Sequence, residues 1–307
     1  MKKYQCLIAG IFVIMAAFTA YFALNGIAEE ESIQTEAYFC PSDDCFGIIA
    51  SYISNASKAD CAFYTLNSAL IENALRRTDS RMVSNEKCPS GVECRAKPSY
   101  RRGLMHDKFC ILDGSIVITG SFNPNEKSKS YRNNVIVLHS VEIAKEYSKE
   151  FNEMWGGSFG AGKKGGSKSV FFCPEDECRK HLIEELDKAE ESIYFMTYSF
   201  TDNAIANELP GKIGEGVIVR GFFDKAQNTK WSVYPMLEAK ADVRVYDKGV
   251  LHHKVFIIDN KTVITGSYNP TLNGNENNDE NMLVIRDSAI ASSFLAEFSR
   301  LSNPKAI

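Results

Sequence analysis

An α/β fold made of two similar halves is the structure that this sequence predicts. Short apolar runs alternate with segments of helical periodicity, a pattern typical of sheets covered by helices. One extended motif also occurs twice at constant spacing, first as His106, Lys108, Asp113, Gly120, Ser121 and Asn123, and then as His252, Lys254, Asp259, Gly266, Ser267 and Asn269. The chain is therefore expected to be an internal duplication.

The second half contains the clearest predicted elements. Its apolar runs are rich in β-branched and aromatic residues, which predicts strands at 193–200, 217–224, 243–246, 254–259, 262–265 and 281–285. Helices are expected at 202–209 and 288–301.

The first half repeats this scheme in part. A strand at 62–66 aligns with 194–198, further strands are expected at 109–112, 116–119 and 134–138, and a helix is expected at 141–155. No clear counterpart of the strand at 217–224 is visible. A polar stretch at 76–102 stands in its place.

A stretch rich in glycine and serine separates the halves. Such residues cannot bury a core, so 156–168 is expected to be a flexible linker. The two halves then extend over 36–155 and 169–307, each about the size of a small domain. The segment 39–45 also recurs as 172–178, which supports this division.

The duplicated motif resembles the paired H-x-K-x4-D motifs of the phospholipase D superfamily. A single short motif is weak evidence, but two copies with the same spacing are strong evidence. The resemblance implies cleavage of phosphodiester bonds without a metal ion or other cofactor. It also implies two phospholipase D-like α/β sandwich halves that pack as a monomeric pseudo-dimer around one active site.

The motif residues suit this chemistry. On an extended strand His106 and Lys108 point to one face, as do His252 and Lys254. A phosphodiester needs a nucleophile, a proton donor for the leaving oxygen and neutralisation of its charge, and two imidazoles can divide the first two tasks. The resemblance implies a covalent phosphohistidine, with His106 expected as the nucleophile and His252 as the general acid.

The remaining motif residues have supporting roles in the resemblance. The nonbridging phosphate oxygens are expected to contact Lys108, Lys254, Asn123 and Asn269, with assistance from Ser121 and Ser267. Asp113 and Asp259 follow the apolar part of the motif strands and are expected to be structural supports.

Glu280 is a further catalytic candidate. It stands where small nucleases of the family carry a carboxylate that orients a catalytic imidazole, and we expect it beside His252. The first half has Asn133 at that place, so the two histidines should be inequivalent.

The amino-terminal segment, 1–28, is expected to be a single-pass membrane anchor. Residues 6–24 carry no charge and as a helix would cover about 28 Å, close to the ~30 Å of a bilayer core. Lys2 and Lys3 favour an amino terminus inside the cell and a catalytic part outside the cytoplasm. The alternative is a cleaved signal peptide and secretion.

Cysteine usage agrees with export. Of nine cysteines, one lies in the apolar segment, and the others include the close pairs Cys40 with Cys45, Cys88 with Cys94, and Cys173 with Cys178. In an oxidising compartment these pairs predict disulfides, whereas in a reducing one they would be free thiols or metal ligands. The spacing typical of zinc sites is missing, which favours disulfides.

The substrate is less determined than the reaction. The stretch 76–102 holds eight basic and three acidic residues, which is either a basic rim that attracts a polyanion or an ordinary solvated loop. A net charge of −4 argues against a protein that coats long nucleic acids. Compact halves favour a nuclease acting on DNA or RNA. The membrane anchor leaves a phospholipase D that forms phosphatidic acid as the alternative, and a catalytically silent surface binding protein as a third possibility.

Overall fold

The computed structural model describes residues 33–160, 162, 164–165 and 167–302. The chain divides into two compact units, 1–34 and 35–307, and the fold described below is that of the second. The expected anchor at 1–28 and parts of the expected linker lie outside the described residues. Within the described ranges, no helix combines the length and the apolar character needed to cross a bilayer.

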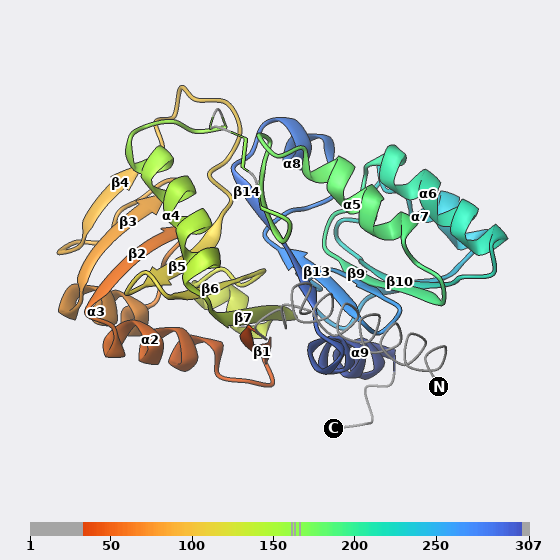
Figure 1. Ribbon diagram of the computed structural model, residues 1–307, viewed down its shortest axis with the longest axis horizontal. Coiled ribbons are helices and arrows are strands. Elements are labelled where there is room, and N and C mark those ends of the chain that lie inside the picture. Colours follow the sequence, from red (N-terminus) through yellow and green to blue (C-terminus); the bar gives the residue numbers. More distant parts are fainter. Residues whose placement is uncertain (1–32, 161, 163, 166, 303–307) are drawn as a thin grey trace, which may run out of the picture. The chain divides into compact units, whose positions relative to one another are not determined.

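Two mixed sheets of seven strands form the framework (Figure 1). The first has the order β1 (Gln34–Cys40), β7 (Asn133–His139), β6 (Ile116–Gly120), β5 (Lys108–Leu112), β2 (Lys58–Phe63), β3 (Asp79–Ser84), β4 (Glu93–Ala96). The second has the order β11 (Asp242–Tyr246), β10 (Ile218–Asp224), β9 (Ser192–Thr197), β12 (Lys254–Ile258), β13 (Thr262–Gly266), β14 (Glu280–Arg286), β8 (Val170–Cys173). The two orders match strand for strand when one is read backwards, which confirms the duplication.

This match corrects two expectations about the first half. β3 lies beside β2 as β10 lies beside β9, so the half does contain a counterpart of the strand at 217–224. Polar residues in β3 make this strand hard to recognise in the sequence. Arg81 on β3 is partly buried, and its guanidinium donates two hydrogen bonds to the Asp60 carboxylate on β2, at 2.8 and 2.7 Å. The expected alignment of 62–66 with 194–198 is also wrong by two residues. Phe63 and Thr197 each pair with a motif lysine, so the next residues, Tyr64 and Tyr198, correspond to each other.

Helices cover the outer faces of both sheets and fill the space between them. They are α2 (Cys45–Asn55), α3 (Ala69–Arg77), the 3₁₀ helix η1 (Glu126–Ser130), α4 (Val141–Trp155), α5 (Cys178–Asp187), α6 (Asn203–Gly214), α7 (Tyr234–Glu238), α8 (Leu272–Glu276) and α9 (Ser288–Ser302). Side-chain caps fix several helix starts. The Asp202 carboxylate, for example, accepts hydrogen bonds from the first turn of α6.

A shared hydrophobic core joins the halves. Phe109, Tyr147 and Phe151 of the first half belong to the same buried cluster as Val255 and Phe294 of the second. α4 and α9 contribute to this cluster, whereas α2 and α3, like α5 and α6, pack on separate outer cores (Figure 1). The central strands β5 and β12 are buried along their whole length. They therefore present the motif residues from a rigid support.

Four disulfides join the cysteines among the described residues: Cys40–Cys45, Cys61–Cys110, Cys88–Cys94 and Cys173–Cys178. The prediction of local disulfides is confirmed. The remaining pair bridges β2 and β5, where the two cysteines are direct cross-strand neighbours.

Candidate active site

Both motif histidines lie just before a central strand and are tied to the opposite half. The backbone N–H of His106, ahead of β5, donates to the carbonyl oxygen of Asp279 at 2.9 Å. The N–H of His252, ahead of β12, donates to the carbonyl oxygen of Arg132 at 2.8 Å. Each histidine is therefore fixed where the halves meet, and the two motifs together form one site.

The side chains that orient the histidines also come from the opposite half. Nδ1 of His106 lies 2.6 Å from Oε2 of Glu280, which is fully buried. Nδ1 of His252 lies 2.7 Å from Oδ1 of Asn133 and 3.1 Å from the carbonyl oxygen of Ser121. In both cases an oxygen acceptor holds the proton on Nδ1 and leaves Nε2 as the nitrogen available for chemistry.

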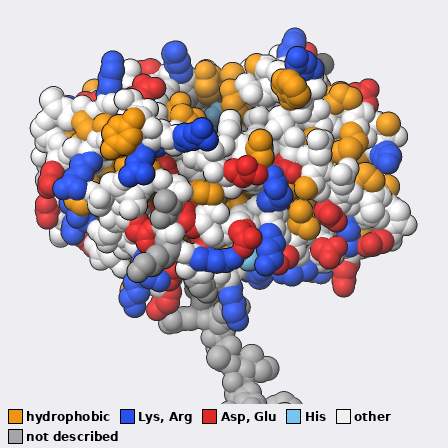
Figure 2. Space-filling view, turned by 90° about the horizontal axis from the view of Figure 1, so that it is seen from above, with side chains coloured by type: hydrophobic (Ala, Val, Ile, Leu, Met, Phe, Trp, Pro, Cys, Tyr) orange, Lys and Arg blue, Asp and Glu red, His pale blue; other side chains and the backbone are white. Residues whose placement is uncertain are grey.

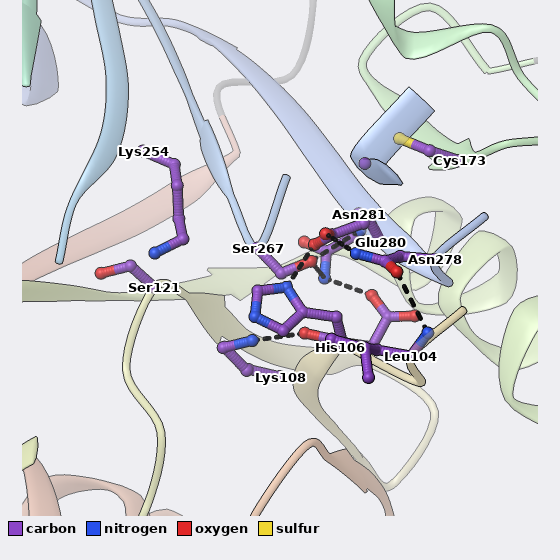
Figure 3. A network of polar contacts seen from close by, with 12 residues as sticks. Leu104, His106, Lys108, Ser121, Cys173, Lys254, Ser267, Asn278, Glu280 and Asn281 are labelled. Atoms are coloured by element: carbon purple, nitrogen blue, oxygen red, sulfur yellow. Dashed lines mark hydrogen bonds and ion pairs between the residues drawn. The ribbon is translucent and has the colours of Figure 1, made fainter. Parts of the chain in front are cut away.

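The expected pairing of Glu280 with His252 is therefore wrong. Glu280 is the first residue of β14, and this strand end reaches the interface, where it faces the motif of the other half (Figure 3). The first residue of β7, Asn133, does the same in the reverse direction. Each histidine therefore contacts the orienting residue of the opposite half and not that of its own half.

The two motif lysines are buried and converge on this site. Nζ of Lys108 donates to the backbone carbonyl of His106, and Nζ of Lys254 donates to that of His252 at 2.7 Å. Burial lowers the pKa of Lys108 to about 8. Burial, followed by the charge of Lys108, lowers the pKa of Lys254 well below its ordinary value. Two ammonium groups held close without full solvation form a site that favours an anion.

The same environment keeps both imidazoles neutral in the free protein. Burial, followed by the nearby lysine charges, lowers the pKa of His106 and of His252 well below 6.5. Burial also raises the pKa of Glu280 to about 7, although the lysines act in the opposite direction. A bound anion would offset the lysine charges and favour protonation of an imidazole.

The motif serines contact the orienting residues. Ser121 is fully buried, and its hydroxyl donates to Oδ1 of Asn133 at 3.2 Å and accepts from the backbone N–H of Asn134 at 3.0 Å. The hydroxyl of Ser267, also fully buried, accepts from the N–H of Asn281 at 2.9 Å. Both hydroxyls thus hold the strand ends that carry the histidine partners.

The motif asparagines each have an amide oxygen with unused hydrogen-bonding capacity. Oδ1 of Asn123 and Oδ1 of Asn269 are buried and have no hydrogen-bond partner among the described residues. A polar atom buried in this way is costly unless another group satisfies it. Both side chains could therefore contribute to binding a polar ligand.

The motif aspartates lie at the far ends of the motif strands. The Asp113 carboxylate accepts backbone hydrogen bonds from Ser57 and Lys58 at 2.8–3.2 Å. The Asp259 carboxylate accepts them from residues 190–192 at 2.8–3.0 Å. Each aspartate ties its motif strand to the start of the neighbouring strand, away from the histidines.

Two residues at the site were not predicted from the sequence. Tyr64 and Tyr198 lie against the rings of His106 and His252, with ring centroids 5.0 and 4.7 Å apart, respectively. The signal that could have revealed them is the correct register of β2 against β9, in which the two tyrosines coincide.

Half of the eight basic residues in the stretch 76–102 are bound within the fold, namely Arg76, Arg81, Arg95 and Lys97. The other four are exposed, namely Arg77, Lys87, Arg101 and Arg102, and the last two stand shortly before the first motif. No group of three or more His, Cys, Asp or Glu side chains in the described part of the chain is arranged to hold a metal ion.

Comparison with known proteins identifies the family. Residues 30–155 and 182–302 match the family profile described as "Cardiolipin synthase, PLD-like domain". The chain belongs to the phospholipase D superfamily. A phospholipase D of Rickettsia prowazekii is 38% identical over 143 residues, which are 45% of this chain and 70% of that protein. As a member of this superfamily, the chain is a phosphodiester hydrolase.

Two more distant similarities agree with this assignment. A mitochondrial cardiolipin hydrolase of Mus musculus is 32% identical over 123 residues, 39% of this chain and 56% of that protein. The crystal structure of a phosphatidylserine synthase from Haemophilus influenzae Rd KW20 superposes with a TM-score of 0.65, over 90% of this chain and 86% of that one. At 11% identity, the latter is a likeness of fold alone.

Proposed function

We propose that the protein cleaves phosphodiester bonds without a metal ion, through a phosphohistidine formed on His106. The observation that carries this proposal is the crossed pairing of the two imidazoles with unlike partners. The Glu280 carboxylate accepts the Nδ1 proton of His106 and increases the basicity of Nε2, as a nucleophile requires. The amide oxygen of Asn133 fixes the His252 ring without adding a charge.

The reaction has two steps. Nε2 of His106 attacks phosphorus, the bond to the leaving oxygen breaks, and protonated His252 gives its proton to that oxygen. His252, now neutral, then takes a proton from water, whose oxygen attacks phosphorus while the phosphorus–nitrogen bond breaks. The ammonium groups of Lys108 and Lys254 neutralise the charge that develops on the nonbridging oxygens. The Nδ2 groups of Asn123 and Asn269 donate to the same oxygens, while Ser121 and Ser267 act through the strand ends they hold.

Substrate binding prepares the acid. Because both histidines are neutral in the free site, His252 needs a proton before it can serve as the donor. The negative charge of the bound phosphodiester offsets the two lysines and raises the pKa of His252. The substrate thus promotes protonation of His252, the imidazole that contacts an amide and not a carboxylate.

Nucleic acid is the substrate class that we propose first. Exposed Arg101 and Arg102 precede the first motif, and the neighbouring Tyr100 side chain is 80% exposed. Cations that contact phosphates beside an aromatic ring that stacks on a base are typical of proteins that bind single strands. Figure 2 shows a face on which basic, hydrophobic and acidic side chains are mixed, with small areas of histidine visible.

A phospholipid substrate is the second candidate, and specific observations favour it. The curated relatives are named phospholipase D and cardiolipin hydrolase. In addition, Trp231 is 71% exposed on the loop after β10, with Nζ of Lys230 at 4.8 Å from its ring. Tryptophan with lysine is a combination typical of membrane surfaces.

One experiment tests both candidates. The full-length protein in mild detergent is incubated with single-stranded DNA, RNA and phosphatidylcholine in excess EDTA. Oligonucleotide fragments are the expected products. Phosphatidic acid alone would establish the second candidate, and complete dependence on added Mg²⁺ or Zn²⁺ would contradict the histidine mechanism.

We also propose that the protein is a monomer whose catalytic part lies outside the cytoplasm, anchored by the segment at 1–28. The four disulfides support an oxidising compartment. Secretion after cleavage of that segment is the alternative. Digestion of intact cells with an external protease tests the location: the catalytic part should be degraded, and its protection would contradict the proposal.

A further inference from the structure

In the first half, a tyrosine packs against both reactive groups of its motif. The ring of Tyr64 meets the ring of His106 edge-on, with centroids 5.0 Å apart and planes at 62°. Nζ of Lys108 lies 5.3 Å from the centroid of the same ring. The tyrosine is partly exposed, whereas the histidine beside it is buried.

The second half repeats this arrangement. The ring of Tyr198 lies 4.7 Å from the ring of His252, and Nζ of Lys254 lies 5.0 Å from its centroid. Tyr198 is likewise partly exposed. The tyrosine is thus kept at the same place beside the histidine and the lysine in both halves, although other core positions of the two strands differ, such as Cys61 and Phe195.

Both tyrosines are fixed to the motifs through the backbone. The N–H of Tyr64 donates to the carbonyl oxygen of Asp107 at 2.9 Å, and the N–H of Tyr198 donates to that of His253 at 2.8 Å. Asp107 and His253 are the residues between the histidine and the lysine of each motif. Each ring is therefore held in register with the two side chains that it contacts.

The ring face suits a buried lysine beside an anionic substrate. An aromatic face attracts an ammonium group through its quadrupole, within about 6 Å of the centroid. A carboxylate in the same place would attract the ammonium more strongly, but it would also repel the phosphate. The contact between the two rings, edge-on for Tyr64 and tilted for Tyr198, restricts rotation of the imidazole as well. A tyrosine ring thus orders both groups without cancelling the positive potential of the site.

The hydroxyl groups, in contrast, have unlike surroundings. The Tyr198 hydroxyl accepts a hydrogen bond from Nε2 of Gln227 at 3.2 Å, whereas no such bond to the Tyr64 hydroxyl is found among the described residues. What the two tyrosines share is the position of the ring.

We propose that Tyr64 and Tyr198 are positioning residues, which hold the imidazole and ammonium groups of their motifs through their ring faces. The inference rests on the proposed phosphodiesterase function. It assigns each tyrosine a different role: Tyr64 orders the nucleophile His106, and Tyr198 orders His252, the acid of the first step and the base of the second. The consequence is that the two tyrosines should differ in their dependence on the leaving group.

The test compares Tyr64→Leu and Tyr198→Leu on two substrates, one with an alkyl leaving group and bis(p-nitrophenyl) phosphate, whose leaving group needs little acid assistance. Tyr64→Leu should lower kcat by about tenfold or more on both substrates, with KM changed little. Tyr198→Leu should lower kcat to a similar extent on the alkyl substrate. On the activated substrate it should slow the burst of p-nitrophenol, which reports the first step alone, by less than about threefold.

Conservative and distant variants complete the design. Tyr64→Phe and Tyr198→Phe, which keep the rings, should restore most of the activity. Tyr52→Leu removes a partly buried tyrosine on α2 that bonds to Glu36, and it controls for general destabilisation. Thermal unfolding of every variant verifies folding.

The outcomes separate the inference from the function on which it rests. An inactive wild-type protein contradicts the phosphodiesterase itself. With an active wild type, the inference is overturned if the Leu variants match the Tyr52→Leu control or if the Phe variants are as impaired as the Leu variants. It is also overturned if Tyr198→Leu slows the first step equally on both substrates.

Discussion

The two halves share one architecture but hold their histidines differently. His106 contacts a buried carboxylate of the second half, whereas His252 contacts an amide oxygen of the first. Both partners fix the ring, but only the carboxylate supplies a negative charge that changes the basicity of the imidazole. Two copies of one motif can therefore have different roles when the residue that orients the histidine differs between the halves.

The interface contains a second difference of the same kind. Between the motif histidine and lysine stand Asp107 in the first half and His253 in the second, both fully buried. Nδ2 of Asn281 donates to Oδ1 of Asp107 at 2.6 Å, whereas Oδ1 of Asn134 faces Nδ1 of His253 at 3.1 Å. The two asparagines are equivalent in position, but their amides are turned in opposite directions to suit an acceptor and a donor.

The cores of the halves differ by an exchange of volume. The cross-strand pair Cys61 and Cys110 of the first half corresponds to Phe195 and Phe256 of the second, whose ring centroids are 5.8 Å apart. Next to Phe195 stands Gly221, where an added Cβ would lie 2.0 Å from the phenyl ring. The first half has Met82 beside Cys61. Bulk on one strand is thus matched by a small residue on its neighbour.

Replacing the histidines is the strongest test of their division of labour. His106→Ala should reduce kcat by about 10⁴-fold or more, because no phosphoenzyme can form. His252→Ala should be equally inactive on an alkyl phosphodiester but should still accumulate labelled phosphoenzyme from bis(p-nitrophenyl) phosphate. Samples quenched in alkaline denaturant measure the label, because acid would hydrolyse the phosphorus–nitrogen bond. Label in the His106→Ala protein together with none in His252→Ala would reverse the two roles.

Exchanging the orienting residues sharpens the comparison. Glu280→Gln should lower kcat by about 10²-fold, since His106 loses the carboxylate that increases its basicity. Asn133→Asp should change kcat less than about tenfold and raise the pKa of His252. Steady-state kinetics across pH measure both effects, and Asn133→Gln provides a neutral control. Equal losses in Glu280→Gln and Asn133→Asp would show that charge at these positions does not distinguish the histidines.

The pH dependence of turnover should report the same asymmetry. The carboxylate of Glu280, with its pKa raised to about 7, accepts a proton as pH falls through that value, and activity should decline about tenfold per pH unit below it. Lys108, with its pKa lowered to about 8, loses its charge as pH rises, and activity should decline above that value. The profile is therefore a bell with its maximum between pH 7 and 8. Glu280→Gln should remove the acidic limb, and a flat profile from pH 5 to 10 would contradict both assignments.

Two disulfides of the first half are expected to affect activity least, because they lie in its core and not at the active site. Replacing Cys61 and Cys110 with alanine should lower the free energy of unfolding by about 4 kcal/mol, because the disulfide closes a loop with a sequence separation of 49. Replacing Cys40 and Cys45, separated by only 5, should cost about 2 kcal/mol. Urea denaturation measures both, and kcat should stay within about twofold. A larger loss for the short loop would contradict this order.

The sequence alone identified the duplication, the motif residues and the general chemistry. Each motif is a local signal, in which alternation along a strand determines which side chains share a face. The strands expected at 254–259 and 262–265 therefore occur nearly as predicted, as β12 and β13. β3 escaped detection because Arg81 and Asp60 satisfy each other across strands that are distant in sequence.

The tertiary structure decided which groups act on which histidine. Glu280 is nearer in sequence to His252, yet it contacts His106, 174 residues away. Tyr64 and Tyr198 likewise reach the site only once β2 and β9 are paired in register with the motif strands. Pairing between halves depends on how two sheets pack through a common core, and neither the spacing nor the periodicity of residues along one half contains that information.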